Sequence, residues 1–503
     1  MRNFVLLILL IVSTANGLFS QQKTDSLQFA TELSNVGAYK QMFNIMDVYR
    51  KQHPDNMYAE WLYAQAAFYN GKYALMQEVY ENAIAKNAAN EFLKLDYAFK
   101  LTDAGLLKKA KAILLDYVLG NTQNAVAYEY LAKIVYWQLN HNDALFYIEK
   151  AQALIPQSAS IKTLHEDILL AKAVKTEYEF KYFHDNQPIK SANNRLGVSK
   201  YVNPYFSPAL QFNLQQLDTL GFGMKSVWVK LASVSYFSKI KLLLNYNVGV
   251  LGFPNGAAKL TAKMAADMVL YKNLSVTLKY ERNPYMLMKS SLDTAFMSND
   301  LFLALQYSNS KKGYAQIAYQ GSVFDDGNSI STLMAWAVAP LVSVNRFSMF
   351  LGYGFGYTNS HKDTYTSIKP KDELFPDIYF NEPILGHFDS YMTPVDQKVH
   401  SLVGVISFEP FRFLKISMSG SYGFRASIMT PYLYGYFTDT FEVVLERDYY
   451  KEQFVPFELK IMAQVSLGKR VSLLVEQCHS NPNYYYKSNY FKLGINFNLA
   501  QYE

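Results

Sequence analysis

The sequence has a single cysteine among its 503 residues, so no disulfide can form within the chain. We interpret that residue, Cys478, as a small strand residue rather than a thiolate nucleophile or a metal ligand. Beyond residue 20 no apolar run reaches the roughly 18 residues that a transmembrane helix needs. The net charge is +6 and no long basic run occurs, which argues against nucleic-acid binding.

Motifs for catalysis and metal binding are lacking as well. The histidines are scattered, with no HExxH motif and no metal-ligand spacing. The segment GYGFGY (352–357) lacks the spacing of a phosphate-binding loop. His479 and Ser480 lie near an expected strand end, but nothing pairs them into a catalytic constellation. We predict no catalytic, cofactor-binding or metal-binding residues, and we expect no enzyme activity and no cofactor.

The first twenty residues have the pattern of a secretory signal. Arg2 supplies a positive charge, and the apolar segment 4–12 that follows is too short to span a bilayer. Cleavage is predicted after Gly17 or Ser20. We therefore expect residues 1–20 to be a signal peptide and the chain to leave the cytoplasm.

The next third of the chain repeats with a period of 34 residues. This spacing separates members of three sets: Gly37, Gly71 and Gly105; Asn56, Asn90 and Asn124; and Ala30, Ala64, Ala98 and Ala132. Between them, apolar residues recur with helical spacing, which is typical of an α-solenoid. The pattern resembles the tetratricopeptide repeat family, with Ala132, Ala144, Ala151 and Pro156 at its small-residue and terminal-proline positions. Four units fit (23–56, 57–90, 91–124 and 125–158), and a closing helix at 159–172 completes a domain over 21–173.

The resemblance implies a concave groove that binds a peptide or a protein. Carried over onto this sequence, the groove residues are Tyr58, Trp61, Gln65, Phe68, Phe92, Phe99, Lys133 and Tyr136. A face so rich in aromatic residues favours partner binding. The alternative is that several of these side chains pack between repeats.

From about residue 174 the period changes to two, which is a strand period. In the last run, Phe491, Leu493, Ile495, Phe497 and Leu499 alternate with polar or small residues. About sixteen such runs occur, and the 41 tyrosines and 34 phenylalanines suit interfacial girdles. Every second connection is short, whereas the others include long segments at 284–297, 359–396 and 426–453. A soluble sandwich has no reason for this asymmetry, so the pattern predicts an antiparallel transmembrane barrel over 174–503.

The polar face of the alternation predicts which residues line the barrel lumen. These are Glu177, Glu179, Lys181, Lys241, Lys279, Glu281, Lys415, Glu458, Lys460, Glu476 and Lys492, together with the stripe Gly352, Gly354 and Gly356. Mixed charges suit a water-filled channel, but a plugged barrel would show the same residues as ion pairs. The glycine stripe leaves room for a passing substrate, or for a packed loop or facing side chains.

A tetratricopeptide array followed by a barrel resembles the outer-membrane exporters of exopolysaccharides such as poly-N-acetylglucosamine and cellulose. The resemblance implies a bacterial outer-membrane location, repeats in the periplasm, and passive export of a polar polymer. The expected partners are outer-membrane lipid, a periplasmic protein in the repeat groove, and polysaccharide in the lumen. The alternative is a plugged barrel that transports nothing and anchors the repeats as a scaffold for a secretion or envelope complex.

Overall fold

The computed structural model describes residues 26–87, 89–187, 189–309, 311–368, 384, 386–440, 442–483 and 486–499. The predicted signal peptide, and the middle of the predicted loop 359–396, lie outside these ranges. The chain divides into two compact units. The first unit comprises the chain up to Trp137 together with Asn142–Glu166. The second unit comprises Gln138–His141 and the chain from Asp167 onward.

No helix in the described ranges is long and apolar enough to cross a membrane.

The N-terminal part consists of paired helices, as the 34-residue period predicts. The pairs and the closing helix are α2 (Ser26–Asn35) with α3 (Tyr39–Gln52), α4 (Met57–Tyr69) with α5 (Tyr73–Lys86), α6 (Glu91–Asp103) with α7 (Leu107–Gly120), α8 (Ala125–Trp137) with α9 (His141–Leu154), and α10 (Ala159–Lys172). The repeated asparagines cap first helices: the Oδ1 atoms of Asn56, Asn90 and Asn124 each accept a backbone N–H three residues later, at 3.0–3.1 Å.

The repeated small residues have separate structural tasks. Ala30, Ala64, Ala98 and Ala132 are fully buried, which lets neighbouring helices approach closely. Gly37, Gly71 and Gly105 lie in the turns within the pairs at φ of 73–76°, a conformation that glycine adopts without strain. In the fourth pair the same place is taken by Leu139 at φ 57°. The turn of the fourth pair thus has the same left-handed backbone conformation although it lacks the glycine.

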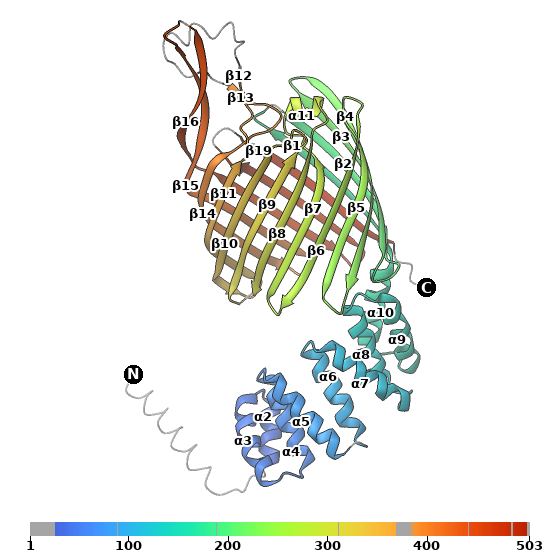
Figure 1. The fold of residues 1–503 in the computed structure, drawn as a ribbon. Helices are drawn as coiled ribbons and strands as arrows, with labels where there is room; N and C mark the ends of the chain where they lie inside the picture. The colour runs from blue at the N-terminus through green and yellow to red at the C-terminus, as the bar shows by residue number, and fades with distance from the viewer. Residues whose placement is uncertain are drawn as a thin grey trace, which may run out of the picture. The chain divides into compact units, whose positions relative to one another are not determined.

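The C-terminal part is a closed antiparallel barrel (Figure 1). In the described chain it has sixteen strands, and β1 pairs with β19 to close it. The strands are β1 (Val174–Asp185), β2 (Ile189–Lys200), β3 (Ser207–Thr219), β4 (Phe222–Phe237), β5 (Leu242–Gly252), β6 (Ala258–Tyr271), β7 (Leu274–Pro284), β8 (Met297–Asn309), β9 (Gly313–Phe324), β10 (Ser329–Val344), β11 (Phe347–Ser360), β14 (Val395–Phe411), β15 (Leu414–Phe437), β17 (Phe457–Leu467), β18 (Val471–Asn481) and β19 (Ser488–Leu499).

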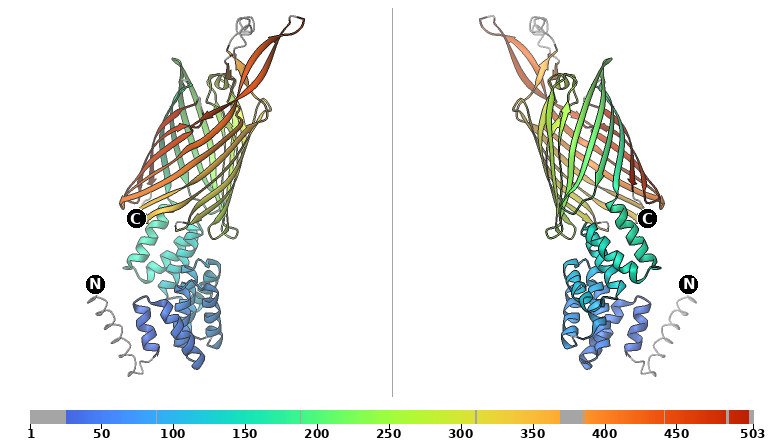
Figure 2. Two further views of the ribbon diagram at one scale, coloured as in Figure 1. Left: turned by 90° about the vertical axis from the view of Figure 1, so that its left-hand side faces the viewer. Right: turned by 90° about the vertical axis from the view of Figure 1, so that its right-hand side faces the viewer.

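One strand pair continues beyond the barrel rim. The first half of β15 pairs with β17, and its second half pairs with β16 (Val443–Phe454). β16 and β17 are therefore successive parts of one strand, separated by Val455 and Pro456. Figure 2 shows the resulting hairpin standing clear of the rim. The predicted loop 426–453 is thus largely a strand pair, because residues on both sides of its tip alternate in register.

The barrel wall is apolar outside. Leu210, Leu231, Leu260 and Ile317 are among its most exposed side chains, at 52–71%. Such a continuous apolar exterior is stable only in lipid, and a closed barrel leaves no unpaired strand edge there. The terminal strand follows the same rule, since Phe491, Ile495, Phe497 and Leu499 lie on the exposed face. The barrel is therefore membrane-spanning, with the architecture of outer-membrane proteins.

Candidate functional site: a charged chamber and an aromatic cap

A cavity of about 690 Å³ lies at the end of the barrel where the short turns are. We call it the chamber. Its walls come from the inner faces of β1 to β7, and its lining includes Glu177, Arg195, Gln211, Lys230 and Glu281. Each of these side chains lies on the strand face opposite to the exposed apolar residues, as the two-residue period requires. The volume is within the range of small-molecule binding pockets, about 300–1,000 Å³.

Ion pairs order one side of the chamber. The Arg195 guanidinium lies 3.2 Å from Glu179 and 3.6 Å from Glu177. The Gln211 amide donates to Glu177 at 3.1 Å. On the other side, Glu281 pairs closely with Lys279 and lies 3.9 Å from Lys263. These residues come from five different strands, so the barrel itself brings them together.

A second polar group lies near the seam where β1 meets β19. Glu476 is 8% exposed and accepts a hydrogen bond from the Tyr490 hydroxyl at 2.6 Å. The Lys492 ammonium pairs with the same carboxylate at 3.2 Å. The Lys181 ammonium lies over the Tyr490 ring, 4.4 Å from its centroid. The buried Cys478 is close to this group in sequence and is a free thiol.

The remaining predicted lumen residues do not belong to either of these polar groups. Glu458 and Lys460 lie on β17 opposite Ser480 and Cys478 of β18. Lys415 is near the start of β15 and pairs with Glu409 at 3.4 Å, where both side chains are half exposed. Lys241 is not in a strand: it lies in the turn between β4 and β5 at φ 52°, so strand alternation does not place its side chain.

In the glycine stripe of β11, the space beside each Cα differs from one glycine to the next. A methyl group on Gly352 would come 1.8 Å from the Ala337 carbonyl oxygen of β10. One on Gly354 would meet Val403 and Trp336 at 3.0 and 3.6 Å, whereas one on Gly356 would meet nothing within 4 Å. Most of the stripe therefore accommodates adjacent strands and side chains, and only Gly356 borders open space.

An apolar layer lies at the opposite end of the barrel. The connection between β7 and β8 contains the short helix α11 (Lys289–Asp293), which Figure 1 shows at the rim. Leu292 of α11 is fully buried against Ile189 of β2 and Leu217 of β3. Ala295 and Met297 pack on Leu251 and Phe253, from β5 and the turn after it. This connection thus reaches across to strands β2 to β5.

A second part of this layer comes from the predicted loop 359–396. Tyr391 is fully buried, and its ring stacks on Phe324 and Phe296 at centroid distances of 4.0 and 5.3 Å. Its hydroxyl donates to Asp326 at 2.7 Å. Burial, followed by this hydrogen bond, raises the pKa of Tyr391. We call the layer formed by 285–297 and 389–393 the cap.

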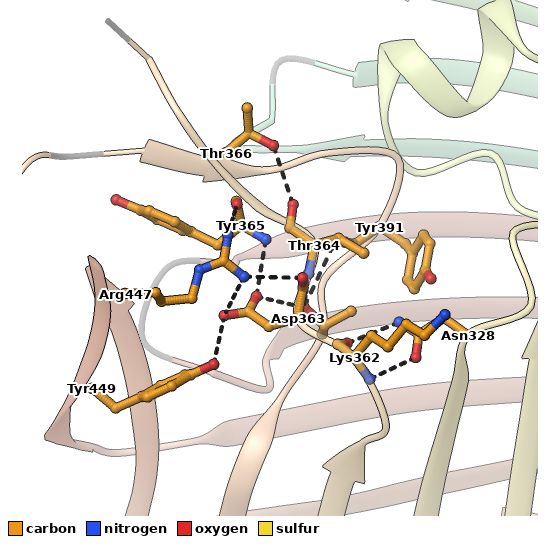
Figure 3. Close-up of polar contacts among 10 residues, drawn as sticks. Asn328, Lys362, Asp363, Thr364, Tyr365, Thr366, Tyr391, Arg447 and Tyr449 are labelled. Carbon is orange, nitrogen blue, oxygen red and sulfur yellow. Dashed lines mark hydrogen bonds and ion pairs between the residues drawn. The ribbon is translucent and has the colours of Figure 1, made fainter. Parts of the chain in front are cut away.

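The cap is connected to the external hairpin through Asp363 (Figure 3). The Asp363 carboxylate accepts the Thr393 and Tyr449 hydroxyls at 3.1 and 3.2 Å and lies 3.4 Å from the Arg447 guanidinium. Arg447 also donates to the Tyr365 carbonyl at 2.6 Å. Tyr365 belongs to β12 (Tyr365–Ser367), which pairs with β13 (Gly386–Phe388). One buried carboxylate thus joins β16 to both ends of the long loop.

The predicted groove residues of the repeats form two groups. Tyr58 and Phe92 are 46% and 61% exposed, and their rings lie 5.4 and 5.8 Å from that of Trp61. Trp61 and Gln65 donate to the Asp96 carboxylate of the next repeat, both at 2.7 Å. Trp61 and Gln65, which were predicted to line the groove, therefore also make contacts between repeats. Such packing was the alternative interpretation of the sequence.

The other predicted groove residues are Phe68 on α4, Phe99 on α6, and Lys133 and Tyr136 on α8. The Phe99 ring stacks on Tyr130 at 3.9 Å, and the Lys133 ammonium lies 4.7 Å from the Tyr130 centroid. Phe68 is 5.1 Å from the Lys100 ammonium, and Tyr136 follows Lys133 by one helical turn on α8. Asp96 and Tyr130 were not among the residues predicted from the sequence. Asp96 lies 35 residues after Trp61, close to the repeat period, which could have suggested the contact.

Other sequence candidates do not assemble into a reactive site. The His479 ring hydrogen-bonds Asn489 at 2.6 Å on the neighbouring strand. Within the described ranges, no three His, Cys, Asp or Glu side chains are arranged to hold a metal ion.

Helical repeats followed by a closed sixteen-stranded barrel define the class: a β-barrel membrane protein with an N-terminal tetratricopeptide-like array. No protein-family model and no curated protein matches the sequence. Among solved structures, a bacterial polysaccharide outer membrane secretin is similar over 65% of this chain and 99% of its own, at 9% identity and a TM-score of 0.47.

Solved repeat proteins resemble the N-terminal part. Pseudomonas aeruginosa pilF is 18% identical over 29% of this chain and 66% of its own, at a TM-score of 0.27. A tetratricopeptide repeat protein from Parabacteroides merdae is 14% identical over 29% of this chain and 59% of its own, also at 0.27.

Proposed function

We propose that the protein is an outer-membrane channel that exports a polar polymer, with exopolysaccharide as its cargo. The observation that carries this proposal is the charged chamber inside a barrel whose outer wall is apolar. A barrel that served only as an anchor would need no cavity of about 690 Å³ bordered by lysine, arginine, glutamate and amide side chains. Hydroxyl-rich sugars hydrogen-bond readily to such groups.

Export through this barrel requires movement of the cap. Leu292 and Tyr391 occupy the barrel end opposite the chamber, and an apolar constriction blocks ions until it is displaced. The cap is built from connections rather than from strands, so it can move while the barrel stays closed. The cap would then be the gate of the channel.

The second candidate function is a plugged anchor, and the buried core of the cap is the observation that favours it. In that case the barrel would hold the repeats at the membrane and nothing would cross. The two functions differ in a measurable way: a gated channel conducts when the cap is removed, whereas a barrel plugged along its length does not.

The repeats would lie in the periplasm and recruit a protein partner. Tyr58 and Phe92 support this role because large, exposed aromatic side chains on a helical array are typical anchors for a bound segment. Lys133 and Lys100 add positive charge over neighbouring rings, which favours a partner segment that carries carboxylates.

A complementation experiment tests the proposal. We expect a strain lacking the protein to lose surface polysaccharide, and the full-length chain to restore it. Tyr58→Ala with Phe92→Ala should restore less than half, because the partner is no longer held. The matched control is Val36→Ala with Leu119→Ala, two exposed apolar residues outside the groove set, at 77% and 81%. Unchanged polysaccharide in the deletion strain would instead support the anchor.

A further inference from the structure

The chamber has an uneven charge. Its inward-facing lining includes four cationic side chains, Lys175, Arg195, Lys230 and Lys263, but only two carboxylates, Glu177 and Glu281. Most other polar lining residues are neutral, among them Gln211, Asn245 and Asn247. A concave site walled by low-dielectric strands concentrates the field of such an excess. The chamber is therefore electropositive.

The two carboxylates are already neutralised by their neighbours. Glu177 lies beside Arg195, and Glu281 beside Lys263 and Lys279. Among the described residues, no carboxylate lies within 4.0 Å of the Lys175 or the Lys230 ammonium. Lys230 instead rests on the Trp228 ring, 3.2 Å from its centroid. The indole face attracts the ammonium and holds it in place without an opposite charge.

Unsatisfied polar atoms border the same part of the lumen. Asn213 is 6% exposed, and its Oδ1 atom has no hydrogen-bond partner among the described residues. Asn193 Oδ1, at an inward position of β2, lacks one as well. Buried polar groups are normally paired, so these atoms point to a missing partner. The partner needs hydroxyl donors for the amide oxygens.

From this arrangement we propose that the chamber binds a segment of an anionic glycan, a sugar chain that carries carboxylate groups. Its carboxylates would face Lys175 and Lys230, and its hydroxyls would donate to Asn213 and Asn193. Neutral glycans would lack the contact between carboxylates and the two lysines, and amine-bearing glycans would be repelled by the lysine charges. The inference rests on the proposed export function and specifies the cargo of that same lumen.

Binding to the purified full-length protein tests the inference without any transport. The probes are an oligogalacturonate, a neutral malto-oligosaccharide of equal length, a chitosan oligomer and inorganic phosphate, titrated calorimetrically at low salt. We expect the oligogalacturonate to bind best. Lys175→Gln with Lys230→Gln should weaken its binding roughly thirtyfold, since each of the two lost charge contacts at close range contributes on the order of 1 kcal/mol. The matched control, Lys398→Gln with Lys451→Gln, removes two charges elsewhere and should leave binding unchanged.

Several results would overturn the inference. These are equal binding of the neutral oligomer, preferred binding of the chitosan oligomer, phosphate binding as tight as that of the oligogalacturonate, or equal weakening in the control variant. Failure here is distinguishable from failure of the proposed function. A chain that still exports polysaccharide but does not bind oligogalacturonate contradicts the anionic cargo alone, and a chain that binds it without any export phenotype contradicts export alone.

Discussion

The two ends of the barrel lumen are built from the same strands but from opposite chemistry. Along the inner face of β2, Arg195 at the chamber gives way to Asn193, Ser191 and finally Ile189 at the cap. β4 shows the same gradient, from Lys230 and Trp228 to Met224. One end offers charge to a ligand, whereas the other excludes water. Position along a strand, and not only its face, therefore decides what an inward residue does.

This difference suggests a division of labour. The chamber would select cargo by charge, and the cap would control passage by steric closure. Selectivity and gating could then be changed independently, because the residues responsible are on different segments. The experiments below separate the two ends, beginning with the largest expected effect.

Replacing the cap connection should open the lumen. We would exchange residues 287–295 for a Gly-Ser linker of equal length, which removes α11 and the fully buried Leu292. Burial of one leucine contributes about 1.5–3 kcal/mol, so loss of this part of the cap should release the constriction beside β2 to β5. In planar bilayers we expect mean conductance to rise by at least an order of magnitude over the unaltered chain.

The control for this experiment changes the external hairpin instead. Tyr434→Ala with Tyr436→Ala removes two side chains that hydrogen-bond Glu446 and do not belong to the cap. This variant should conduct like the unaltered chain. If the cap replacement folds, as judged by its resistance to unfolding in detergent, and still conducts no ions, the lumen is plugged elsewhere and the anchor function is supported.

Charge reversal in the chamber should alter ion selectivity. In the cap-replaced chain, Lys230→Glu changes the local charge by two units beside the Trp228 ring. We expect the preference for chloride over potassium to fall by roughly threefold to tenfold at low salt, where screening is weak. The reversal potential in a KCl gradient measures this. Lys398→Glu, which alters a residue paired with Asp396 away from the chamber, should shift it far less.

Much of this architecture could be predicted from sequence because it depends on periodicity. The 34-residue repeat predicted the helix pairs. The alternation of apolar and polar residues from Val174 to Leu499 predicted sixteen strands and the residues that face lipid. The cap could not be predicted in this way. Leu292 and Tyr391 belong to connections without a period, and their partners Ile189 and Phe324 are distant in sequence. Asp363 likewise joins segments more than 80 residues apart.

The smallest expected effect concerns one hydrogen bond in the cap. Tyr391→Phe keeps the stacked ring and removes the donor to Asp326. Asp326 is exposed and regains water, so the loss should be about 1 kcal/mol, which corresponds to a roughly fivefold rise in the open fraction. Because burial raises the Tyr391 pKa, the bond is complete below the ordinary tyrosine pKa of about 10 and weakens only as the pH rises beyond it. This bond should therefore not make the open fraction of the unaltered chain change between about pH 7 and 9 in single-channel recordings. An open fraction that is the same in Tyr391→Phe and the unaltered chain would show that stacking alone holds the cap.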